Sequence, residues 1–122
     1  MNELAWAAGF FDGEGYIGIA HQHWEGRCRL QAHAHVSQTD RRPLNRFKRA
    51  VGFGKIRERP DIQKKHPNWR RQWRWDISSI AEVKKLVQLL RPFLSAPKRE
   101  QARKALQKWR GRENFRKRCN AR

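Results

Sequence analysis

The segment Leu4–Ile19 reads LAWAAGFFDGEGYIGI, and it constrains the fold more than any other part of the chain. It starts as an apolar helical run, contains Gly9, and then carries Asp12 and Glu14 among further glycines. An interior glycine costs a helix roughly 1 kcal/mol relative to alanine. Carboxylates at a helix C-terminus face the negative end of the helix dipole. Because both features are unfavourable in an isolated helix, we expect them to serve a contact or a ligand.

Ala5, Gly9 and Gly13 are four residues apart, which places them on one face of the predicted helix. Two backbones can approach closely where side chains are this small. We expect the neighbour to be the same helix from a second copy of the chain. That pairing would bring together two copies of Asp12-Gly13-Glu14, whose carboxylates repel unless a divalent cation joins them. The alternative is that DGEG is a turn that merely ends a helix.

The charge balance of the whole chain indicates a polyanionic partner. The 122 residues include 29 Lys and Arg against 11 Asp and Glu, a formal net charge of +18. Nucleic acid is the leading candidate for the partner of so positively charged a chain. Because the basic residues run through the whole length and are accompanied by six tryptophans, a disordered polycation is excluded in favour of one compact domain.

Cysteine usage and hydropathy predict a soluble intracellular protein, and they leave open whether its compartment is a bacterial or phage-infected cytoplasm or an organelle. Cys28 and Cys119 fit neither a metal-ligand spacing nor a disulfide framework, as is typical of a reducing compartment. The longest apolar run, Leu4–Phe11, is far shorter than the ~20 residues of a membrane span. The N-terminus lacks the basic region of a secretory signal. We therefore expect no membrane association.

Hydrophobic periodicity predicts the element order α-β-β-α-β-β-α-α with an antiparallel sheet that has one packed and one solvated face. The predicted elements after the first helix are a hairpin around Trp24–Arg27, a helix capped by Asp40 and stopped by Gly52, strands at 55–59 and 70–77 around a polar loop at 60–68, and helices started by Ser79 and Pro97. The segment 111–122 loses periodicity, so we expect it to be frayed or to lie on an anion.

The solvated face of this sheet is rich in hydrogen-bond donors and poor in acids. Such side chains read base edges and phosphates in a major groove, although an ordinary solvated face is the alternative. The predicted DNA-binding residues are Arg27, Arg29, Gln31, His33, His35, Arg41, Arg57, Arg59, Arg70, Gln72 and Arg74.

The segment Leu4–Ile19 resembles the signature of the LAGLIDADG homing endonucleases, a helix followed by D-G-(D/E)-G and a strand. The similarity continues through VSQTDRRPLNRFKRAVGFGKI and LLRPFLSAPKREQARKAL, and so extends to about Trp109. The resemblance implies an α+β fold of the LAGLIDADG type, αββαββα, with an antiparallel four-stranded DNA-binding sheet and an extra C-terminal helix. It implies one endonuclease domain over 1–110, followed by a basic tail over 111–122.

The resemblance also implies roles for the first motif. A single copy of the signature is similar to the family members that work as homodimers, with Ala5, Gly9, Asp12 and Gly13 at the interface. Glu14 matches the essential metal-binding acid, and Gly13 contributes its backbone carbonyl to the same site. Asp12 matches the less essential first acid. The implied cofactor is Mg²⁺ or Mn²⁺, with no organic cofactor.

Three positions outside the first motif match further active-site residues of the family. Gln38 matches a polar residue that orders water near the scissile phosphate. Lys98 matches the basic active-site residue, with Arg99 as the alternative. Arg41 matches a second basic position.

The function implied is metal-dependent, site-specific hydrolysis of both strands of a long, pseudo-palindromic double-stranded DNA site. By resemblance, the strands are cut across the minor groove, leaving short 3′ overhangs. The alternatives on the same fold are an RNA splicing maturase and a DNA-binding regulator without cleavage activity. A nonspecific basic nucleic-acid-binding protein is a third possibility.

Overall fold

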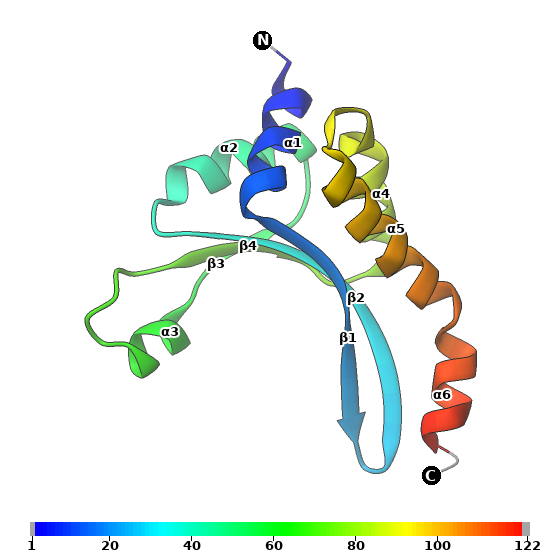
Figure 1. Cartoon of the computed structure of the whole chain (residues 1–122). Helices are drawn as coiled ribbons and strands as arrows, with labels where there is room; N and C mark the ends of the chain where they lie inside the picture. Colours follow the sequence, from blue (N-terminus) through cyan, green and yellow to red (C-terminus); the bar gives the residue numbers. More distant parts are fainter. Residues whose placement is uncertain (1, 121–122) are drawn as a thin grey trace.

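The computed structural model describes residues 2–120 of the chain (Figure 1). Its elements, in chain order, are α1 (Glu3–Glu14), β1 (Gly15–Trp24), β2 (Arg27–Gln38), α2 (Arg41–Val51), β3 (Lys55–Glu58), α3 (Pro60–Lys65), β4 (Trp73–Ile77), α4 (Ile80–Leu90), the 3₁₀ turn η1 (Arg91–Phe93), α5 (Ala96–Arg110) and α6 (Arg112–Asn120). Within the described residues, no helix combines the length and the apolar character that a membrane crossing requires.

The four strands form one antiparallel sheet in the order β1-β2-β4-β3. The β1–β2 ladder runs from the pair Gly15 and Val36 to the pair Trp24 and Arg27. Strand β4 pairs with β2 only from Ala34 to Gln38. The outer part of the β1–β2 hairpin therefore extends beyond the other two strands (Figure 1). The predicted α+β class and antiparallel sheet are confirmed.

The core lies between the sheet and helices α1, α2, α4 and α5, which cover one of its faces (Figure 1). Trp75 is fully buried at the centre, where its Nε1 donates to the Phe53 carbonyl at 2.9 Å and its ring meets Phe47 edge-on. A side chain at Gly54, which has φ of 95°, would collide with the Trp75 ring. Burying an aromatic side chain of this kind is worth about 2–3 kcal/mol, so the core fixes the sheet firmly beneath the helices.

The helix starts follow the predicted capping chemistry. The Asp40 carboxylate accepts from the Arg42 backbone N–H at 2.9 Å and caps α2. Ser79 Oγ accepts from the Glu82 N–H at 3.2 Å, which caps α4 at the predicted residue, and donates to the Glu82 carboxylate at 3.0 Å. Gly52 ends α2 in the left-handed region, with φ of 90°.

Three predicted segments differ in the structure. Strand β4 begins at Trp73 rather than at residue 70: its ladder with β3 ends at the pair Glu58 and Trp73, and one further backbone bond, from the Arg59 N–H to the Gln72 carbonyl at 2.7 Å, precedes it. The polar loop at 60–68 contains the short helix α3, which Pro60 starts at a position where no N–H is needed. The tail is helical over its described part and packs along β2 rather than fraying, since Phe115 and Cys119 face the hairpin.

The expectation that Cys28 and Cys119 form no disulfide is wrong. Cys28 on β2 and Cys119 on α6 are joined in a disulfide, although 91 residues separate them in sequence. The error arose because the sequence pattern alone did not place α6 against the hairpin.

Candidate functional site

The chain passes from α1 into β1 without a loop, so the acidic residues of the first motif lie at the junction of helix and sheet. Phe11 is fully buried there, and a side chain at Gly15 would collide with its ring. The Asp12 carboxylate accepts from the Ser95 backbone N–H at 3.1 Å and from Ser95 Oγ at 3.0 Å. Asp12 therefore ties the end of α1 to the start of α5, a structural role that the sequence pattern did not indicate.

Glu14 differs from Asp12 in having no bonded neighbour. Its side chain is exposed, and within residues 2–120 its carboxylate has no hydrogen-bond or ion-pair partner. The Ile17 N–H would bond to the Gly13 carbonyl in a continuing helix, but it donates instead to Gln101 Oε1 at 3.2 Å. Glu14 and the preceding Gly13 thus offer a carboxylate and a backbone carbonyl at the end of α1, and such hard oxygen donors suit Mg²⁺ or Mn²⁺.

Lys98 on α5 lies next to this junction. Its Nζ donates to the Gly15 carbonyl at 2.6 Å and to Gln101 Oε1 at 3.3 Å, and it stands 5.6 Å from the centre of the Phe11 ring. Arg99 instead lines a groove between α4 and α5. Of the two basic candidates, the structure places Lys98 at the junction. Gln101, which the sequence reasoning missed, is recognisable as the residue one helical turn after Lys98.

Gln38 and Arg41 lie at the same end of the sheet as the acidic motif. The β1–β2 ladder ends with Gly15 opposite Val36, and Gln38 is two residues further along β2. Arg41 is exposed at the first position of α2. Its neighbour Arg42 binds the Asp40 carboxylate at 2.7 Å and, through these hydrogen bonds, lowers the pKa of Asp40 to about 2.

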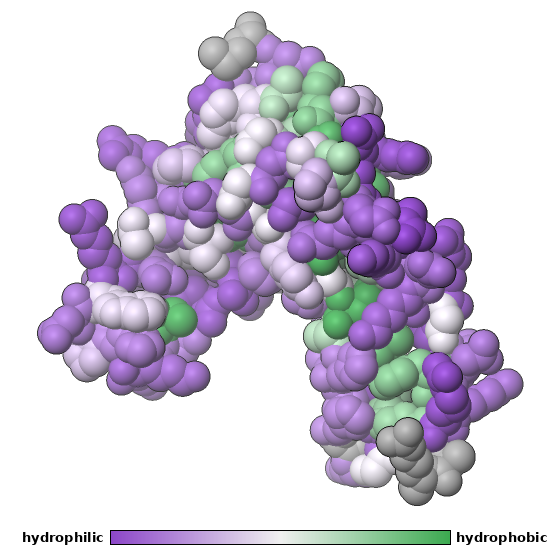
Figure 2. Space-filling view, viewed as in Figure 1, coloured by the Kyte–Doolittle hydropathy of each residue, from purple (hydrophilic) through white to green (hydrophobic). Residues whose placement is uncertain are grey.

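One face of α1 is open and nearly free of side chains. Gly9 and Gly13 are exposed, and a Cβ added at either would meet nothing within 4 Å. Ala7 and Ala8, on the opposite face, are fully buried. Figure 2 shows apolar surface in the upper part of the molecule, where Figure 1 places α1. No contact within residues 2–120 therefore explains Gly9 and Gly13.

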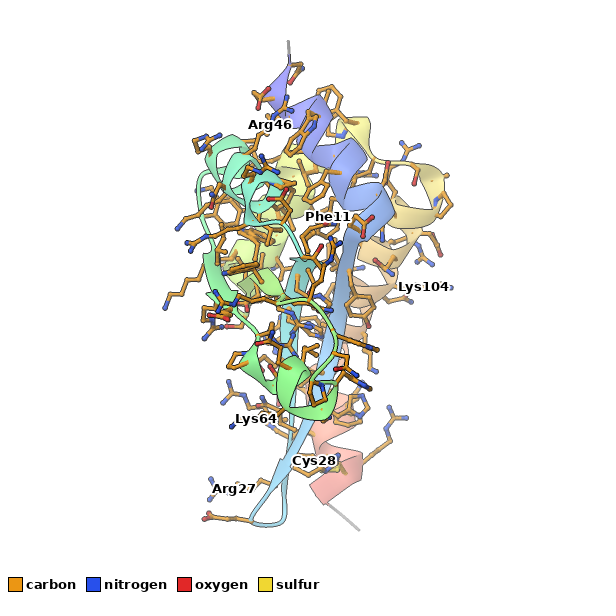
Figure 3. The ribbon with its side chains drawn as sticks, turned by 90° about the vertical axis from the view of Figure 1, so that its left-hand side faces the viewer. Phe11, Arg27, Cys28, Arg46, Lys64 and Lys104 are labelled. Atoms are coloured by element: carbon orange, nitrogen blue, oxygen red, sulfur yellow. A yellow bond between two sulfur atoms is a disulfide. The ribbon has the colours of Figure 1, made fainter. Side chains whose placement is uncertain are left out.

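The uncovered face of the sheet is concave. Figure 2 shows an arch between two limbs, one formed by α3 and its flanking loops and the other by the β1–β2 hairpin with α6. Arg27 is exposed at the tip of the hairpin, far from Phe11 and Arg46 at the α1 end (Figure 3). Glu25 and Gly26 form the hairpin turn with positive φ at both positions, as a two-residue type I′ turn requires.

The predicted alternation places polar side chains on this concave face. Tyr16, His33 and His35 form an aromatic cluster on it, with ring centroids 5.4–5.7 Å apart. Gln22 Nε2 donates to Gln31 Oε1 across the hairpin at 2.7 Å. Alternation and register place these side chains on the concave face: Tyr16, Gln22, Arg29, Gln31, His33, His35, Ser37, Lys55, Arg57, Arg74 and Asp76.

Several arginines predicted to bind DNA are already held in place. Arg57 binds the Asp76 carboxylate at 2.9 Å, and Arg59 binds Asp61 at 2.8 Å. Arg74 Nε donates to Ser37 Oγ at 3.3 Å. Arg70 is exposed in the segment before β4, and the half-buried Gln72 accepts from the Arg59 N–H through its carbonyl. The predicted residues therefore lie on the strands and on the adjoining α3 limb, except for Arg41, which lies on α2.

The two central histidines are neutral at physiological pH. Burial, together with the nearby Arg74 guanidinium, lowers the pKa of His33 below its usual value of 6.5 and that of His35 to about 4. A neutral imidazole carries one hydrogen-bond donor and one acceptor. Each ring can therefore either donate a hydrogen bond to a base edge or accept one from it, and neither ring adds charge to the concave face.

This pKa shift predicts a stability change at acidic pH. The pKa of His35 is 6.5 in the unfolded chain and about 4 in the folded protein. Protonation of His35 therefore favours the unfolded state, so its contribution to the unfolding free energy is fully present above pH 6.5 and is lost as the pH falls toward 4. We expect His35→Asn to reduce the loss in unfolding free energy between pH 7 and pH 4 by about 2 kcal/mol. Urea denaturation at both pH values measures this loss. His66→Asn, at an exposed site on the α3 limb, is the control, and equal losses in both variants would contradict the prediction.

Comparison with known proteins identifies the fold. No protein-family model and no curated protein matches the sequence. The structure is similar to the homing endonuclease I-CvuI in two DNA complexes, one with Mg and uncleaved DNA (TM-score 0.71) and one with Ca (0.74), both at 24% identity. These alignments cover 86% and 93% of this chain and 64% and 69% of I-CvuI. In the first alignment the chain thus spans slightly less than two thirds of I-CvuI.

Two further homing endonucleases show the same architecture. I-TnaI aligns with a TM-score of 0.67 at 19% identity, covering 85% of this chain and 69% of its own. I-GzeII, a LAGLIDADG homing endonuclease in complex with its DNA target, aligns with a TM-score of 0.58 at 14% identity, covering 74% and 28%. The chain has the fold of the LAGLIDADG homing endonucleases, as its first motif predicts.

Proposed function

We propose that this chain is a homodimeric, metal-dependent endonuclease that cuts both strands of a long, pseudo-palindromic DNA site. The observation that carries the proposal is the junction of α1 and β1. There the exposed Glu14, whose carboxylate has no partner within residues 2–120, and Lys98, whose Nζ binds the Gly15 carbonyl, occupy one end of a concave, basic sheet face. The fold shared with DNA-bound homing endonucleases supports the same reading.

The concave face suits the major groove of duplex DNA. Its arginines form charge-assisted hydrogen bonds to phosphates or to guanine, and its glutamines suit adenine. A single face of this length matches about one turn of major groove, which is a half-site. A two-fold dimer would place two such faces end to end, and this is why we expect the target to be approximately palindromic.

The donors at the junction fit a divalent cation. We propose that Glu14 and the Gly13 carbonyl of each subunit hold Mg²⁺ or Mn²⁺, which when bound would supply charge stabilisation and a more acidic water for phosphodiester hydrolysis. Lys98, held by the Gly15 carbonyl, would offset the negative charge that develops on the scissile phosphate. Gln38, at the same end of the ladder, would orient solvent with its amide. Asp12 would keep α1 and α5 in register through Ser95.

The dimer interface would be the open face of α1. Gly9 and Gly13 have no packing partner among the described residues, so a second α1 could approach along them. Phe93 in η1, which packs beside α1, is 40% exposed and would extend this apolar surface. Pairing along α1 would bring the two Glu14 side chains toward the two-fold axis, beneath the centre of the joined faces.

Selection from random DNA tests this function. A library of duplexes with randomised sites would be incubated with the full chain and Mg²⁺, and cleaved ends would be captured and sequenced. We expect one pseudo-palindromic family of sites with short 3′ overhangs. Enrichment of bound but uncut duplexes in both Mg²⁺ and Mn²⁺ would instead identify a binding protein on the same fold.

An arginine on the face provides a test of the DNA interface. We expect Arg57→Ala to weaken binding to the selected site by roughly 1–3 kcal/mol. The variant loses a DNA contact and leaves the Asp76 carboxylate without its partner on the binding face. If Arg57 reads a base, specificity relaxes at one position; if it binds a phosphate, the salt slope falls by about one unit.

The control for this variant is Arg103→Ala. Arg103 is also an exposed arginine in an ion pair, with Glu100 at 2.6 Å, but it lies on α5 at the groove beside α4. Binding curves over a salt series measure both variants. Equal effects of the two substitutions on affinity, specificity and salt slope would show that the concave face is wrongly assigned.

A further inference from the structure

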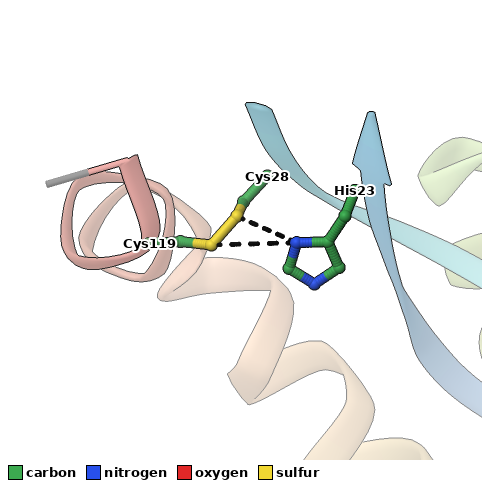
Figure 4. A group of neighbouring side chains, drawn as sticks. All are labelled: His23, Cys28 and Cys119. Atoms are coloured by element: carbon green, nitrogen blue, oxygen red, sulfur yellow. Dashed lines mark hydrogen bonds between the residues drawn. A yellow bond between two sulfur atoms is a disulfide. The ribbon is translucent and has the colours of Figure 1, made fainter. Parts of the chain in front are cut away.

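His23, Cys28 and Cys119 form a cluster (Figure 4), and Cys28 lies far from Phe11 at the junction of α1 and β1 (Figure 3). His23 Nδ1 is 3.1 Å from Cys28 Sγ and 4.0 Å from Cys119 Sγ. All three possible ligand atoms lie within 4.8 Å of one another. The two sulfurs are bonded in this structure, and their Cα atoms are 6.0 Å apart. Nothing in the proposed DNA cleavage uses this cluster.

The cluster joins two elements that need a connection. His23 and Cys28 are directly opposite in the β1–β2 ladder, next to the hairpin turn, where neither β3 nor β4 supports the strands. An isolated two-stranded hairpin is only marginally stable in water. Helix α6 covers this part of the hairpin, with Phe115 packing on His21 at 4.7 Å between ring centroids and Cys119 reaching the cluster one turn later. A link at this point therefore fixes α6 on the hairpin.

The donor set suits zinc rather than magnesium. Two thiolates and one imidazole are soft to borderline ligands, which Zn²⁺ prefers, whereas Mg²⁺ prefers oxygen. The charge environment agrees with this choice. The groove beside Cys28 is lined by one acid, Glu113, which pairs with Arg116 at 2.7 Å, and by four arginines, Arg27, Arg29, Arg112 and Arg116. Neighbouring cations favour thiolates over thiols. Two thiolates neutralise the two charges of Zn²⁺, so a bound ion would add no net charge to a strongly basic surface.

We propose that His23 Nδ1, Cys28 Sγ and Cys119 Sγ form a zinc site when the two cysteines are reduced. A small-molecule thiol reduces the disulfide, giving two cysteine thiols and the oxidised form of the reductant. Binding of Zn²⁺ then releases the two thiol protons. His23 is exposed and Cys119 partly exposed, which leaves the fourth position open to water. The site holds α6 on the hairpin under reducing conditions, as the disulfide does under oxidising ones.

Cobalt binding tests the proposal directly. The full chain is reduced with dithiothreitol, desalted anaerobically and titrated with Co²⁺, whose thiolate charge-transfer absorption and intense tetrahedral visible bands report the ligands. We expect one Co²⁺ per chain, displaced by one equivalent of Zn²⁺. Cys119→Ser should lose the thiolate signal or bind at least about tenfold more weakly, as should His23→Asn. His66→Asn, which removes a histidine outside the cluster, should match the wild type.

Hydrogen exchange gives a second readout that does not depend on absorption. Zn²⁺ should slow amide exchange in α6 of the reduced wild type and should have no such effect in Cys119→Ser. Cys119 is partly exposed near the end of the last helix, so this variant should retain the core and the far-ultraviolet circular dichroism of the wild type. A reduced wild type without a thiolate signal, or an equal signal in Cys119→Ser, would overturn the zinc site and leave the pair as a disulfide only.

Discussion

Glu14→Gln is expected to reduce DNA cleavage by at least about 100-fold while leaving site-specific binding intact. The amide keeps the size of the side chain but loses the charge that holds a divalent cation. A bound metal contributes several kcal/mol to phosphodiester hydrolysis, and each 1.36 kcal/mol is a factor of ten in rate. Because the Glu14 carboxylate has no partner within residues 2–120, the substitution breaks no internal contact of the described structure.

Cleavage time courses and binding curves on the selected DNA site measure the loss of cleavage and the retained binding separately. Glu100→Gln is the matched control, because Glu100 is an exposed glutamate on α5 whose partner is Arg103 rather than the junction. Asp12→Asn should behave differently from Glu14→Gln and lower stability, since the Asp12 carboxylate accepts from both Ser95 donors. Undiminished cleavage by Glu14→Gln in Mg²⁺ would remove Glu14 from the metal site.

Gly9→Leu is expected to abolish both dimer formation and cleavage while leaving the folded monomer intact. A Cβ at Gly9 meets nothing within 4 Å in the chain, and leucine is a better helix former than glycine by almost 1 kcal/mol. The monomer should therefore be as stable as the wild type or more so. The bulky side chain would nevertheless hold two α1 helices apart and misplace Glu14, which is enough to prevent the reaction.

Sedimentation velocity, with and without DNA, should show the loss of the dimer, and thermal unfolding should show an undamaged monomer. The control is Gln88→Leu, which places the same exposed leucine on α4. A fully active Gly9→Leu dimer would show that α1 does not form the interface.

The fold could be predicted from the sequence because local signals and the hydrophobic pattern agree along most of the chain. Asp40 and Ser79 cap the helices that their positions predict, and alternation places Trp75 inward and Arg74 outward on β4. The boundaries were less accurate where the chain leaves the ladder for the α3 limb. The alternation of residues 70–77 continues before Trp73, but Pro60 starts α3 soon after β3 ends at Glu58, so the ladder has no partner residues for Arg70 and Arg71.

The candidate site could be predicted only in part, because its members meet through tertiary packing. The first motif indicated Glu14, and the resemblance indicated Lys98, which the structure places at the same junction. No local pattern showed that Asp12 would be bound by Ser95, 83 residues later in the chain. The same limit explains Cys28 and Cys119, which meet only because α6 lies on the hairpin.

The central claim is that two copies of Glu14 form one metal-dependent active site on the two-fold axis of a DNA-bound dimer. A crystal structure of the full chain with its selected duplex, grown with Mn²⁺ and measured at the manganese absorption edge, tests this claim most directly. The account predicts anomalous density beside the Glu14 carboxylates and Gly13 carbonyls of both subunits, at the centre of the site. Manganese bound elsewhere, or a single subunit on the cleaved DNA, would contradict it.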